Sequence, residues 1–345
     1  MPDIAQPSPS RVLVVGATGF IGSRLTAALA RDPAWHPIAA ARRASRQSDV
    51  EVVTCDATDP AAMTRALAGV EYAVNCIAGS DATMVAATRT LCDAARRSGL
   101  RRLVHLSSMA VYGAATGLVT ESAPAVAPVS GYGVAKQETE RLVQEYGQDG
   151  GQAAILRPGC VYGPGSEQWT GRIARLLRAG RLGDLGADGD GICNLTYVDD
   201  LVTAIRACLT QDEAVGETFN VAMADPPDWN GYLVRFARAL GATPVHRLSG
   251  RQLRLESKLA APALKLAAIG TRVARLPVRM PDAITPSLAA LMRQDIRLDV
   301  SKAAQRLGLG ETSLDWGIAS SVRWVDRMRG DSDPHAETPR ETRAQ

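Results

Sequence analysis

Several features that would assign a protein to a special class are absent from this sequence. The formal net charge is only +3 over 345 residues. The arginines are scattered rather than gathered into a basic stripe with interleaved aromatic residues, so we expect no nucleic-acid partner. The six cysteines include no Cys-x-x-Cys pair and have no histidine nearby at ligand spacing. This pattern favours buried free thiols over a metal site.

Long uninterrupted apolar runs are also missing. The longest candidate, residues 259–278, is interrupted by Lys265, Arg272 and Arg275, whereas a helix that crosses a bilayer needs about 20 predominantly apolar residues. The first residues of the chain have neither the basic nor the apolar region of a secretory signal. We therefore expect a cytoplasmic protein without a membrane span.

The sequence does contain a regular alternation of apolar runs and helical segments. Hydrophobic residues make up 46% of the chain, which is enough for a large core. Short apolar runs predict seven strands, over 11–15, 37–41, 50–54, 71–78, 101–107, 152–157 and 217–221. Strands that alternate with helices predict an α/β fold with a doubly wound parallel sheet, in which the carboxyl ends of the strands lie along one edge.

A glycine-rich turn follows the first predicted strand. The apolar run 12–15 leads into Gly16-Ala17-Thr18-Gly19-Phe20-Ile21-Gly22 and then into a helix. Glycine permits a tight turn, close approach of the backbone to a pyrophosphate, and close packing of helix on strand, while the helix N-terminus offers N–H groups to phosphates. The strand, turn and helix together predict a dinucleotide site rather than a turn without a ligand.

A second motif pairs a phenol with an ammonium group. Tyr132 and Lys136 are four residues apart, on one face of a predicted helix. Upstream, the strand 101–107 runs into Ser107-Ser108-Met109-Ala110-Val111-Tyr112-Gly113. With the G-x-x-G-x-x-G turn, this order of motifs resembles the extended branch of the short-chain dehydrogenase/reductase superfamily, whose members include NAD-dependent epimerases and dehydratases. The run Arg157-Pro158-Gly159-Cys160-Val161-Tyr162-Gly163-Pro164 is similar to the same family.

The resemblance implies a role for each residue of a catalytic group. Ser108 would hydrogen-bond the carbonyl or hydroxyl oxygen of the substrate, and Ser107 is the alternative if the register differs. Tyr132 would act as general acid or base. Lys136 would stabilise the phenolate, lowering the pKa of Tyr132, and would bind the nicotinamide ribose.

The resemblance also implies a cofactor site, with NADP(H) preferred. Where NAD-dependent relatives place an acidic residue after the second strand, this chain has Arg42 and Arg43, which suit a 2′-phosphate. Alternatively, the two arginines are solvated loop charges, and the cofactor is NAD. Asp56 would meet the adenine amino group. The predicted cofactor-binding residues are Gly16, Thr18, Gly19, Phe20, Ile21, Gly22, Arg42, Arg43, Asp56, Ala57, Ala78, Tyr132, Lys136 and Pro158.

Other polar positions are expected to be structural. His105, in the middle of a strand, is interpreted as a core histidine with satisfied hydrogen bonds. Asp59, followed by Pro60, is typical of a helix start, and Asp199 and Asp200 are expected to cap a helix. No metal-binding role is expected for any residue.

The predicted domain organisation follows these motifs. A dinucleotide-binding domain (Rossmann fold) covers 11–160, with 196–222 returning to it. A smaller substrate domain covers 161–195 and 223–328, and flexible tails cover 1–10 and 329–345. Within the substrate domain, 253–292 is expected to form an apolar lid over a substrate or core-facing helices; peripheral membrane binding is a third alternative, which the lack of large aromatic residues there disfavours.

The predicted function is an NADP(H)-dependent oxidoreductase that interconverts a ketone or aldehyde and an alcohol. The alternatives are a nucleotide-sugar epimerase or reductase with bound NAD, and a noncatalytic dinucleotide sensor. Cys193-Asn194-Leu195-Thr196 replaces the Arg-Asp-Phe of many nucleotide-sugar enzymes, and Met109-Ala110 replaces the acids of dehydratases. As the resemblance implies, we expect a homodimer formed through 82–97 and 132–146.

Overall fold

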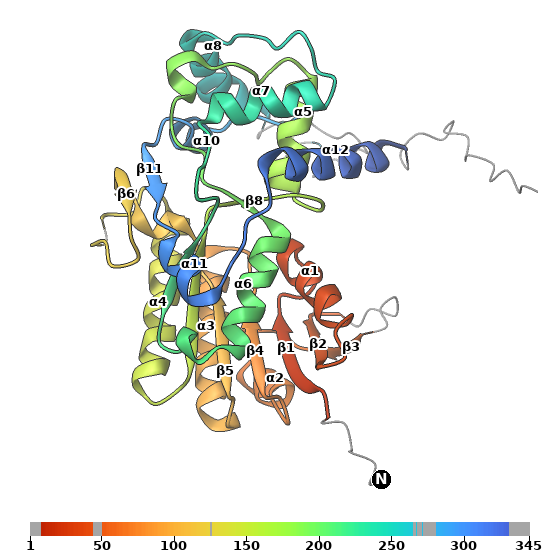
Figure 1. Ribbon diagram of the computed structural model, residues 1–345, viewed down its shortest axis with the longest axis vertical. Helices are drawn as coiled ribbons and strands as arrows, with labels where there is room; N and C mark the ends of the chain where they lie inside the picture. Colours follow the sequence, from red (N-terminus) through yellow and green to blue (C-terminus); the bar gives the residue numbers. More distant parts are fainter. Residues whose placement is uncertain are drawn as a thin grey trace, which may run out of the picture. The chain divides into compact units, whose positions relative to one another are not determined.

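The computed structural model describes residues 8–43, 50–124, 126–264, 267, 271 and 281–330, which form two compact units. The first unit consists of Met1–Val161, Gly191–Pro227 and Gln294–Thr312, and the second of Tyr162–Asp190, Asp228–Arg293 and Ser313–Gln345. Most of both predicted tails, 1–7 and 331–345, lies outside the described residues. Figure 1 shows that the chain passes between the units several times.

The first unit is built on a parallel sheet of seven strands, so the predicted α/β fold class is confirmed. In chain order the strands are β1 (Ser10–Val15), β2 (Trp35–Ala41), β3 (Glu51–Thr54), β4 (Tyr72–Asn75), β5 (Arg102–Leu106), β7 (Ala153–Pro158) and β10 (Thr218–Val221). They lie side by side in the order β10-β7-β5-β4-β1-β2-β3. The strand order reverses at β1, which makes the sheet doubly wound.

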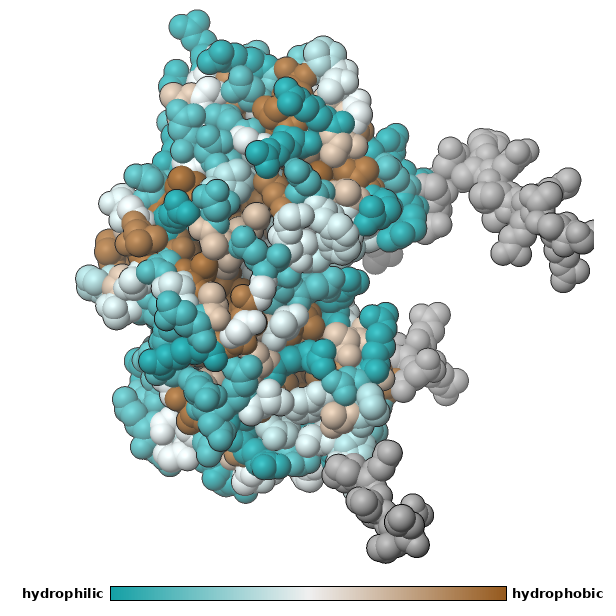
Figure 2. Space-filling view, in the orientation of Figure 1, coloured by the Kyte–Doolittle hydropathy of each residue, from teal (hydrophilic) through white to brown (hydrophobic). Residues whose placement is uncertain are grey.

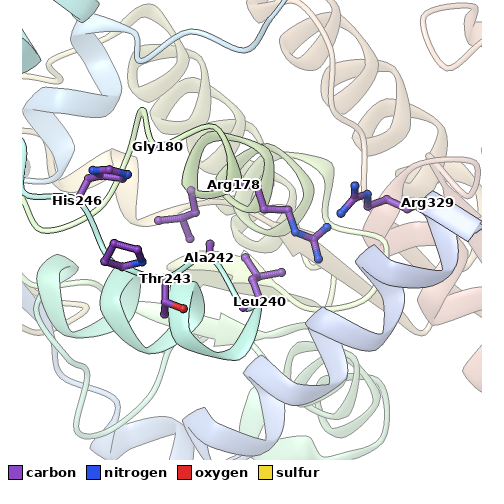
Figure 3. Close-up of a pocket in the computed structure, with 10 residues that line it drawn as sticks. Arg178, Gly180, Leu240, Ala242, Thr243, His246 and Arg329 are labelled. Atoms are coloured by element: carbon purple, nitrogen blue, oxygen red, sulfur yellow. The ribbon is translucent and has the colours of Figure 1, made fainter.

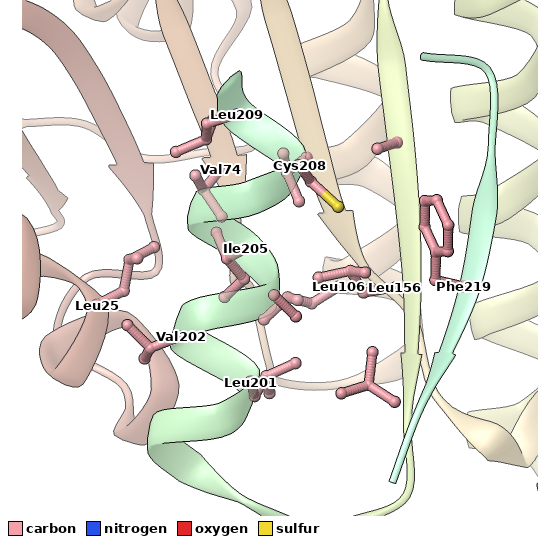
Figure 4. Close-up of a cluster of buried hydrophobic side chains, with 14 of the residues drawn as sticks. Leu25, Val74, Leu106, Leu156, Leu201, Val202, Ile205, Cys208, Leu209 and Phe219 are labelled. Carbon is pink, nitrogen blue, oxygen red and sulfur yellow. The ribbon is translucent and has the colours of Figure 1, made fainter. Parts of the chain in front are cut away.

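Helices cover both faces of this sheet. They are α1 (Phe20–Leu29), α6 (Val198–Thr210) and α11 (Ser301–Leu307) on one face, and α2 (Pro60–Ala66), α3 (Asp81–Ser98) and α4 (Gly131–Gln148) on the other. Successive side chains of a strand point to opposite faces: Val74 of β4 packs in one cluster with Leu25 and Ile205 (Figure 4), and the preceding Ala73 in the other with Leu91. Both faces of the sheet are therefore buried, as the apolar runs predict.

Segments far apart in the sequence add short strands that the apolar pattern did not predict. They are β6 (Gly117–Val119), which pairs with β11 (Ile296–Leu298), and β8 (Cys160–Tyr162), which pairs with β9 (Leu195–Tyr197). The β11 strand is also held by Asn194, whose side chain donates to the Ile296 carbonyl and accepts from the Leu298 amide. These contacts join 294–312 to the first unit, whereas the predicted domain boundary assigns it to the substrate domain.

The second unit is mostly helical and has an aromatic centre. Its elements are η2 (Glu167–Gly171), α5 (Arg172–Arg178), η3 (Gly186–Gly189), α7 (Trp229–Ala239), α8 (Gly250–Leu255), η5 (Glu256–Ala260), α10 (Pro286–Leu291) and α12 (Leu314–Gly330). Trp229 lies 5.8 Å from Trp169 and 6.3 Å from Tyr232, between ring centroids. Much of the predicted segment 253–292 falls outside the described residues; within them, Leu253 is buried and Leu259 is exposed.

Candidate active site

The glycine-rich turn after β1 lies against the end of β4. Gly16 has a φ of +84°, and a Cβ built on it would lie 2.7 Å from the carbonyl oxygen of Cys76. A Cβ on Gly22 would lie 2.3 Å from the carbonyl oxygen of Gly16. Only glycine therefore allows this approach of turn, helix and neighbouring strand. The strand order reverses between β1 and β4, which is the position where open α/β sheets bind ligands.

The N-terminus of α1 is open for an anion. Its N-cap is Gly19, no side chain caps it, and its first turn contains no acidic residue. Thr18 is exposed, whereas Phe20 and Ile21 are half-buried against the core. The first N–H groups and the helix dipole therefore favour a negative group here. The segment fits the pyrophosphate of a dinucleotide, and the fold brings its predicted residues together.

Four predicted cofactor residues follow the neighbouring strands β2 and β3. Arg42 and Arg43 are exposed, and neither forms an ion pair with any described residue. Asp56 accepts hydrogen bonds from the Thr58 amide (3.0 Å) and hydroxyl (2.8 Å), which lower the pKa of its carboxyl, and the nearby Arg42 charge lowers it further. Ala57 is half-buried. Because β2 and β3 follow β1 in the sheet, these four residues lie to one side of the glycine turn, along the same edge of the sheet.

The turn after Asp56 begins a helix as predicted. Asp59 is the N-cap of α2 and accepts from the amides of Ala61 and Ala62, with Pro60 in the first turn. Asp199 and Asp200 behave differently from the prediction, because α6 has no side-chain cap. Asp199 instead pairs with Arg24 (2.6 and 2.7 Å). Asp200 accepts hydrogen bonds from the backbone and hydroxyl of Thr312, a residue too distant in sequence for the pattern to identify.

The remaining predicted residues follow three adjacent strands. Ala78 is exposed after β4, Ser108 follows β5, and the buried Pro158 ends β7. Since β4, β5 and β7 are neighbours in a parallel sheet, these positions lie along the same edge as the glycine turn. The candidate site is therefore this edge of the first unit.

Ser108, Tyr132 and Lys136 are brought together at this edge. Ser130 caps α4 by accepting from the Gly133 amide, which places Tyr132 and Lys136 in the first two turns. The Ser108 side chain lies close enough to the Tyr132 hydroxyl to lower the pKa of the phenol. The Lys136 ammonium lies 5.8 Å from the centre of the Tyr132 ring and donates a 2.7 Å hydrogen bond to the Leu106 carbonyl. Ser107 is buried, and its hydroxyl has no partner among the described residues.

Burial dominates the protonation of the two groups on α4. Lys136 is 5% exposed, and this burial lowers its pKa to about 8. Although 42% of the Tyr132 surface is exposed, partial burial of its side chain raises the pKa of the phenol, the Ser108 side chain lowers it, and the Asp81 carboxylate raises it. From the charge of Lys136 the sequence predicts the opposite direction for Tyr132. In the structure, desolvation of the phenol outweighs the favourable contacts.

A buried polar network lies directly beneath Lys136. His105 Nε2 is 3.1 Å from the Thr139 hydroxyl, which donates its only proton to the Lys136 carbonyl. His105 must therefore donate from Nε2 and accept at Nδ1, from the Asn75 amide at 3.1 Å. Burial and the Lys136 charge hold the pKa of His105 well below its usual value. The ring is a neutral link between β4, β5 and α4, in agreement with the interpretation as a core histidine.

An ion pair that the sequence analysis missed fastens α4 to β7. Glu140 is one turn beyond Lys136, and its carboxylate accepts two hydrogen bonds from Arg157 (2.9 and 2.6 Å). Arg157 also donates to the hydroxyl of Tyr112, which donates to Asn220 at 2.6 Å. The i, i+4 spacing of Lys136 and Glu140 is the only signal in the sequence, and it does not reveal the partner on β7.

Two of the cavities among the described residues are lined by side chains other than Ser108, Tyr132 and Lys136. The larger, about 470 Å³, lies within the second unit, where Arg178, His246 and Arg329 are among its lining residues (Figure 3). The smaller, about 110 Å³, lies within the first unit beside β9 and β10 and includes Asp200. The motifs and the cavities therefore identify different places, and the candidate site rests on the motifs.

Metal sites and membrane-spanning helices are both missing from the described residues. No group of three or more His, Cys, Asp or Glu side chains is arranged to hold a metal ion in this part of the chain. None of the helices described is long and apolar enough to cross a bilayer. The six cysteines are free thiols; five are buried and Cys76 is half-buried.

Comparison with known proteins agrees with this geometry. The family model "NAD dependent epimerase/dehydratase family" matches residues 12–222. The chain is 32% identical over 243 residues to 2'-dehydrokanamycin reductase of Streptomyces kanamyceticus, covering 67% of each chain. It is 34% identical over 263 residues to 3-diazoavenalumate denitrifying reductase of a Streptomyces species, covering 69% of this chain and 84% of the relative.

Among solved structures, the UDP-glucuronic acid 4-epimerase of Bacillus cereus in complex with UDP-glucuronic acid and NAD is similar to this chain. The TM-score is 0.71 at 20% identity, with 92% of this chain and 99% of the epimerase covered. This likeness concerns the fold. Motifs, sheet and family match together establish that the chain belongs to the NAD dependent epimerase/dehydratase family, within the short-chain dehydrogenase/reductase superfamily, and is an enzyme of the NAD(P)-dependent oxidoreductase type.

Proposed function

We propose that this enzyme interconverts a ketone or aldehyde and an alcohol with NADP(H), using Tyr132 as general acid or base. The observation that carries the proposal is the grouping of the Ser108 side chain and the Tyr132 phenol beside the buried ammonium of Lys136, which lies 5.8 Å from the centre of the Tyr132 ring. A hydroxyl, a phenol and a cation in this arrangement can bind a substrate oxygen and exchange a proton with it.

Each residue then has a defined task. The turn 16–22 would hold the pyrophosphate of the cofactor, which supplies or accepts the hydride when bound. Ser108 would orient the substrate oxygen by a hydrogen bond, and Tyr132 would donate its proton to that oxygen during reduction. A phenol with the ordinary pKa of about 10 is already protonated at neutral pH, and the shift of the Tyr132 pKa lies in the same direction, which suits reduction. Lys136 would stabilise the phenolate left behind.

Two observations favour reduction of a carbonyl compound over epimerisation of a sugar nucleotide. Cys193, which stands where nucleotide-sugar enzymes often have the Arg of Arg-Asp-Phe, is fully buried and carries no positive charge. It is therefore not available to a diphosphate. In addition, two relatives above 30% identity bear the names of reductases.

The residues just before Tyr132 in the sequence contribute to a surface that suits a moderately apolar substrate. Val126 and Val129 are exposed, as is Leu118 on β6, where Figure 2 shows hydrophobic residues on the surface. Exposed apolar side chains close together on one surface are typical of binding sites. We therefore expect substrates with an apolar body around the carbonyl group.

The NADP(H) preference is tested by titrating NADPH and NADH into the purified protein. Arg42→Ala/Arg43→Ala should weaken NADPH binding by about 10- to 100-fold and change NADH binding little, because two guanidiniums are lost from the 2′-phosphate. Arg97→Ala, an exposed arginine at the end of α3, is the matched control. NAD that copurifies with the protein, or a preference for NADH, would instead favour the epimerase reading. A carbonyl panel with the preferred cofactor then tests the reaction itself.

We also propose that two copies pair through α3 and α4. These helices pack side by side on one face of the sheet. Their exposed surface carries Val134 beside opposite charges, Arg89, Glu138 and Arg141. Light scattering after size exclusion should give a dimer, and Val134→Glu should shift it towards the monomer.

A further inference from the structure

Asp81 is a carboxylate at the candidate site without an assigned task. It is the first residue of α3, but the helix cap is provided by Ser80, which accepts from the Thr83 amide at 3.2 Å. The Asp81 carboxylate forms no hydrogen bond or ion pair with any of the residues that the structure describes. An acidic residue in the first turn of a helix interacts favourably with the helix dipole, which would explain the charge of Asp81. The dipole does not explain why the carboxylate lies against the start of another helix, α4.

The carboxylate lies against the start of the catalytic helix. Its Oδ2 atom is 2.6 Å from the position that a Cβ would take at Gly131, so only the absence of a side chain there leaves room for it. Tyr132 is the next residue, and the Asp81 charge raises the pKa of its phenol. Asp81 and Tyr132 are both exposed, Tyr132 by 42%. The proposed proton donor therefore has an unneutralised carboxylate beside it.

No cation of the described chain forms an ion pair with this carboxylate. The Lys136 ammonium lies 5.8 Å from the centre of the Tyr132 ring and donates to the Leu106 carbonyl, so it is not paired with Asp81. Ser108, which also acts on the phenol, is neutral. The Asp81 charge therefore opposes formation of the phenolate that Lys136 would stabilise, and a positive charge bound with the substrate would offset it.

We propose that Asp81 binds a protonated amine on the carbonyl substrate. The inference rests on the proposed function and adds the class of its substrate: amino ketones or amino aldehydes and the corresponding amino alcohols. The ammonium group would form an ion pair with Asp81 while the carbonyl oxygen lies between Ser108 and Tyr132. Its charge would offset the carboxylate when Tyr132 gives up its proton. Carbonyl compounds with an anionic group near the carbonyl would be repelled.

The test compares three probes of similar shape with NADPH: an aminocyclohexanone, the corresponding methylcyclohexanone, and oxocyclohexane carboxylate. Wild type should prefer the amine over the methyl compound by about tenfold in kcat/KM and the carboxylate least. Asp81→Asn should reduce this ratio to near one. Asp93→Asn, on the same helix and paired with Arg96 at 2.7 Å, should preserve the ratio. An unchanged ratio in Asp81→Asn overturns the role of Asp81, and reduction of the neutral ketone leaves the proposed function standing.

A second readout does not depend on turnover. Calorimetry should detect binding of the aminocyclohexanol to the NADPH complex, weakened about tenfold by Asp81→Asn and by salt. The ultraviolet titration of Tyr132, taken as wild type minus Tyr132→Phe, should move to lower pH in Asp81→Asn. Absence of both effects overturns the proposal even if no ketone in the panel is reduced, whereas binding without reduction of any ketone overturns the proposed reaction alone.

Discussion

The two units of this protein bury different kinds of side chain. Every buried side chain with a charge or an imidazole in the described residues belongs to the first unit: Arg102, His105, Lys136 and Glu140. The buried polar residues of the second unit are hydroxyl-bearing only: Ser166, Thr170, Ser257 and Ser321. Its core is instead centred on aromatic rings around Trp229. Burying an ionisable group is unfavourable unless hydrogen bonds and opposite charges compensate it.

This difference indicates where the fold is organised around chemistry and where around packing alone. In the first unit, burial lowers the pKa of Lys136 to about 8, and the hydrogen-bond network of Asn75, His105 and Thr139 lies next to it. The second unit contains no residue with a comparable environment among those described. Substitutions in the first unit should therefore change activity and pH dependence, and those in the second should change stability.

The largest expected effect is on the packing of the second unit. Trp229 is fully buried, and its indole N–H has no partner among the described residues. Trp229→Ala should destabilise this unit by about 4 kcal/mol because it leaves a cavity. Trp229→Phe should lose much less. Hydrogen exchange followed by mass spectrometry should show faster exchange in second-unit peptides. If exchange became equally faster in peptides of both units, the two units would unfold together, and the proposed difference between them would be wrong.

Next in size is the loss of the phenol in the first unit. Tyr132→Phe should lower kcat by about 10²- to 10³-fold, because general acid catalysis is removed, while cofactor affinity and melting temperature stay close to wild type. Tyr232→Phe is the matched change in the second unit, where the hydroxyl donates to the Trp169 carbonyl at 3.0 Å. It should cost about 1 kcal/mol of stability. Full activity of Tyr132→Phe on a proven substrate would exclude Tyr132 as the proton donor.

A smaller effect concerns the pH dependence of stability. The folded-state pKa of Lys136 is about 8, below the ordinary 10.5. Between these values the unfolded chain holds a proton that the folded protein has lost, so stability rises with pH through this window. Below it the buried charge is destabilising. Lys136→Met should therefore gain roughly 2 kcal/mol over wild type near neutral pH, an advantage that fades towards pH 10. Urea unfolding at several pH values measures it.

The control for that series is Lys258→Met, an exposed lysine of the second unit. Its difference from wild type should not change across the same pH range. Lys136→Met should also be inactive, which would separate the function of the ammonium from its unfavourable burial. A constant offset between Lys136→Met and wild type at all pH values would contradict the lowered pKa.

The smallest expected effect comes from His105. Because its pKa lies well below the usual 6.5, only the unfolded chain takes up a proton as the pH falls through this value, and stability decreases. His105→Gln keeps a donor and an acceptor and should remove about 1 kcal/mol of this loss per pH unit below about 6.5. His246→Gln, exposed in the second unit, should show the wild-type slope.

Much of the first unit was accessible from local sequence patterns. The seven apolar runs correspond to the seven strands of the sheet, and the turn 16–22 folds against β4 as glycine at those positions requires. The side-chain pairs that fasten α4 and η1 (Met109–Tyr112) to neighbouring strands were not accessible in this way. Arg157 and Glu140 are 17 residues apart, and Tyr112 and Asn220 are 108 apart. No short-range pattern relates such pairs, and the same holds for the pairing of β6 with β11.

By itself, the sequence determined the α/β class, the order of the motifs and the edge of the sheet at which they meet, because alternation, glycine spacing and helical periodicity act over a few residues. Only the tertiary structure decided that Lys136 is buried, that His105 is neutral, that Asp81 lies against Gly131, and that 294–312 belongs to the first unit. Burial, dielectric environment and charge proximity depend on residues distant in the chain, and they exist only once the fold has formed.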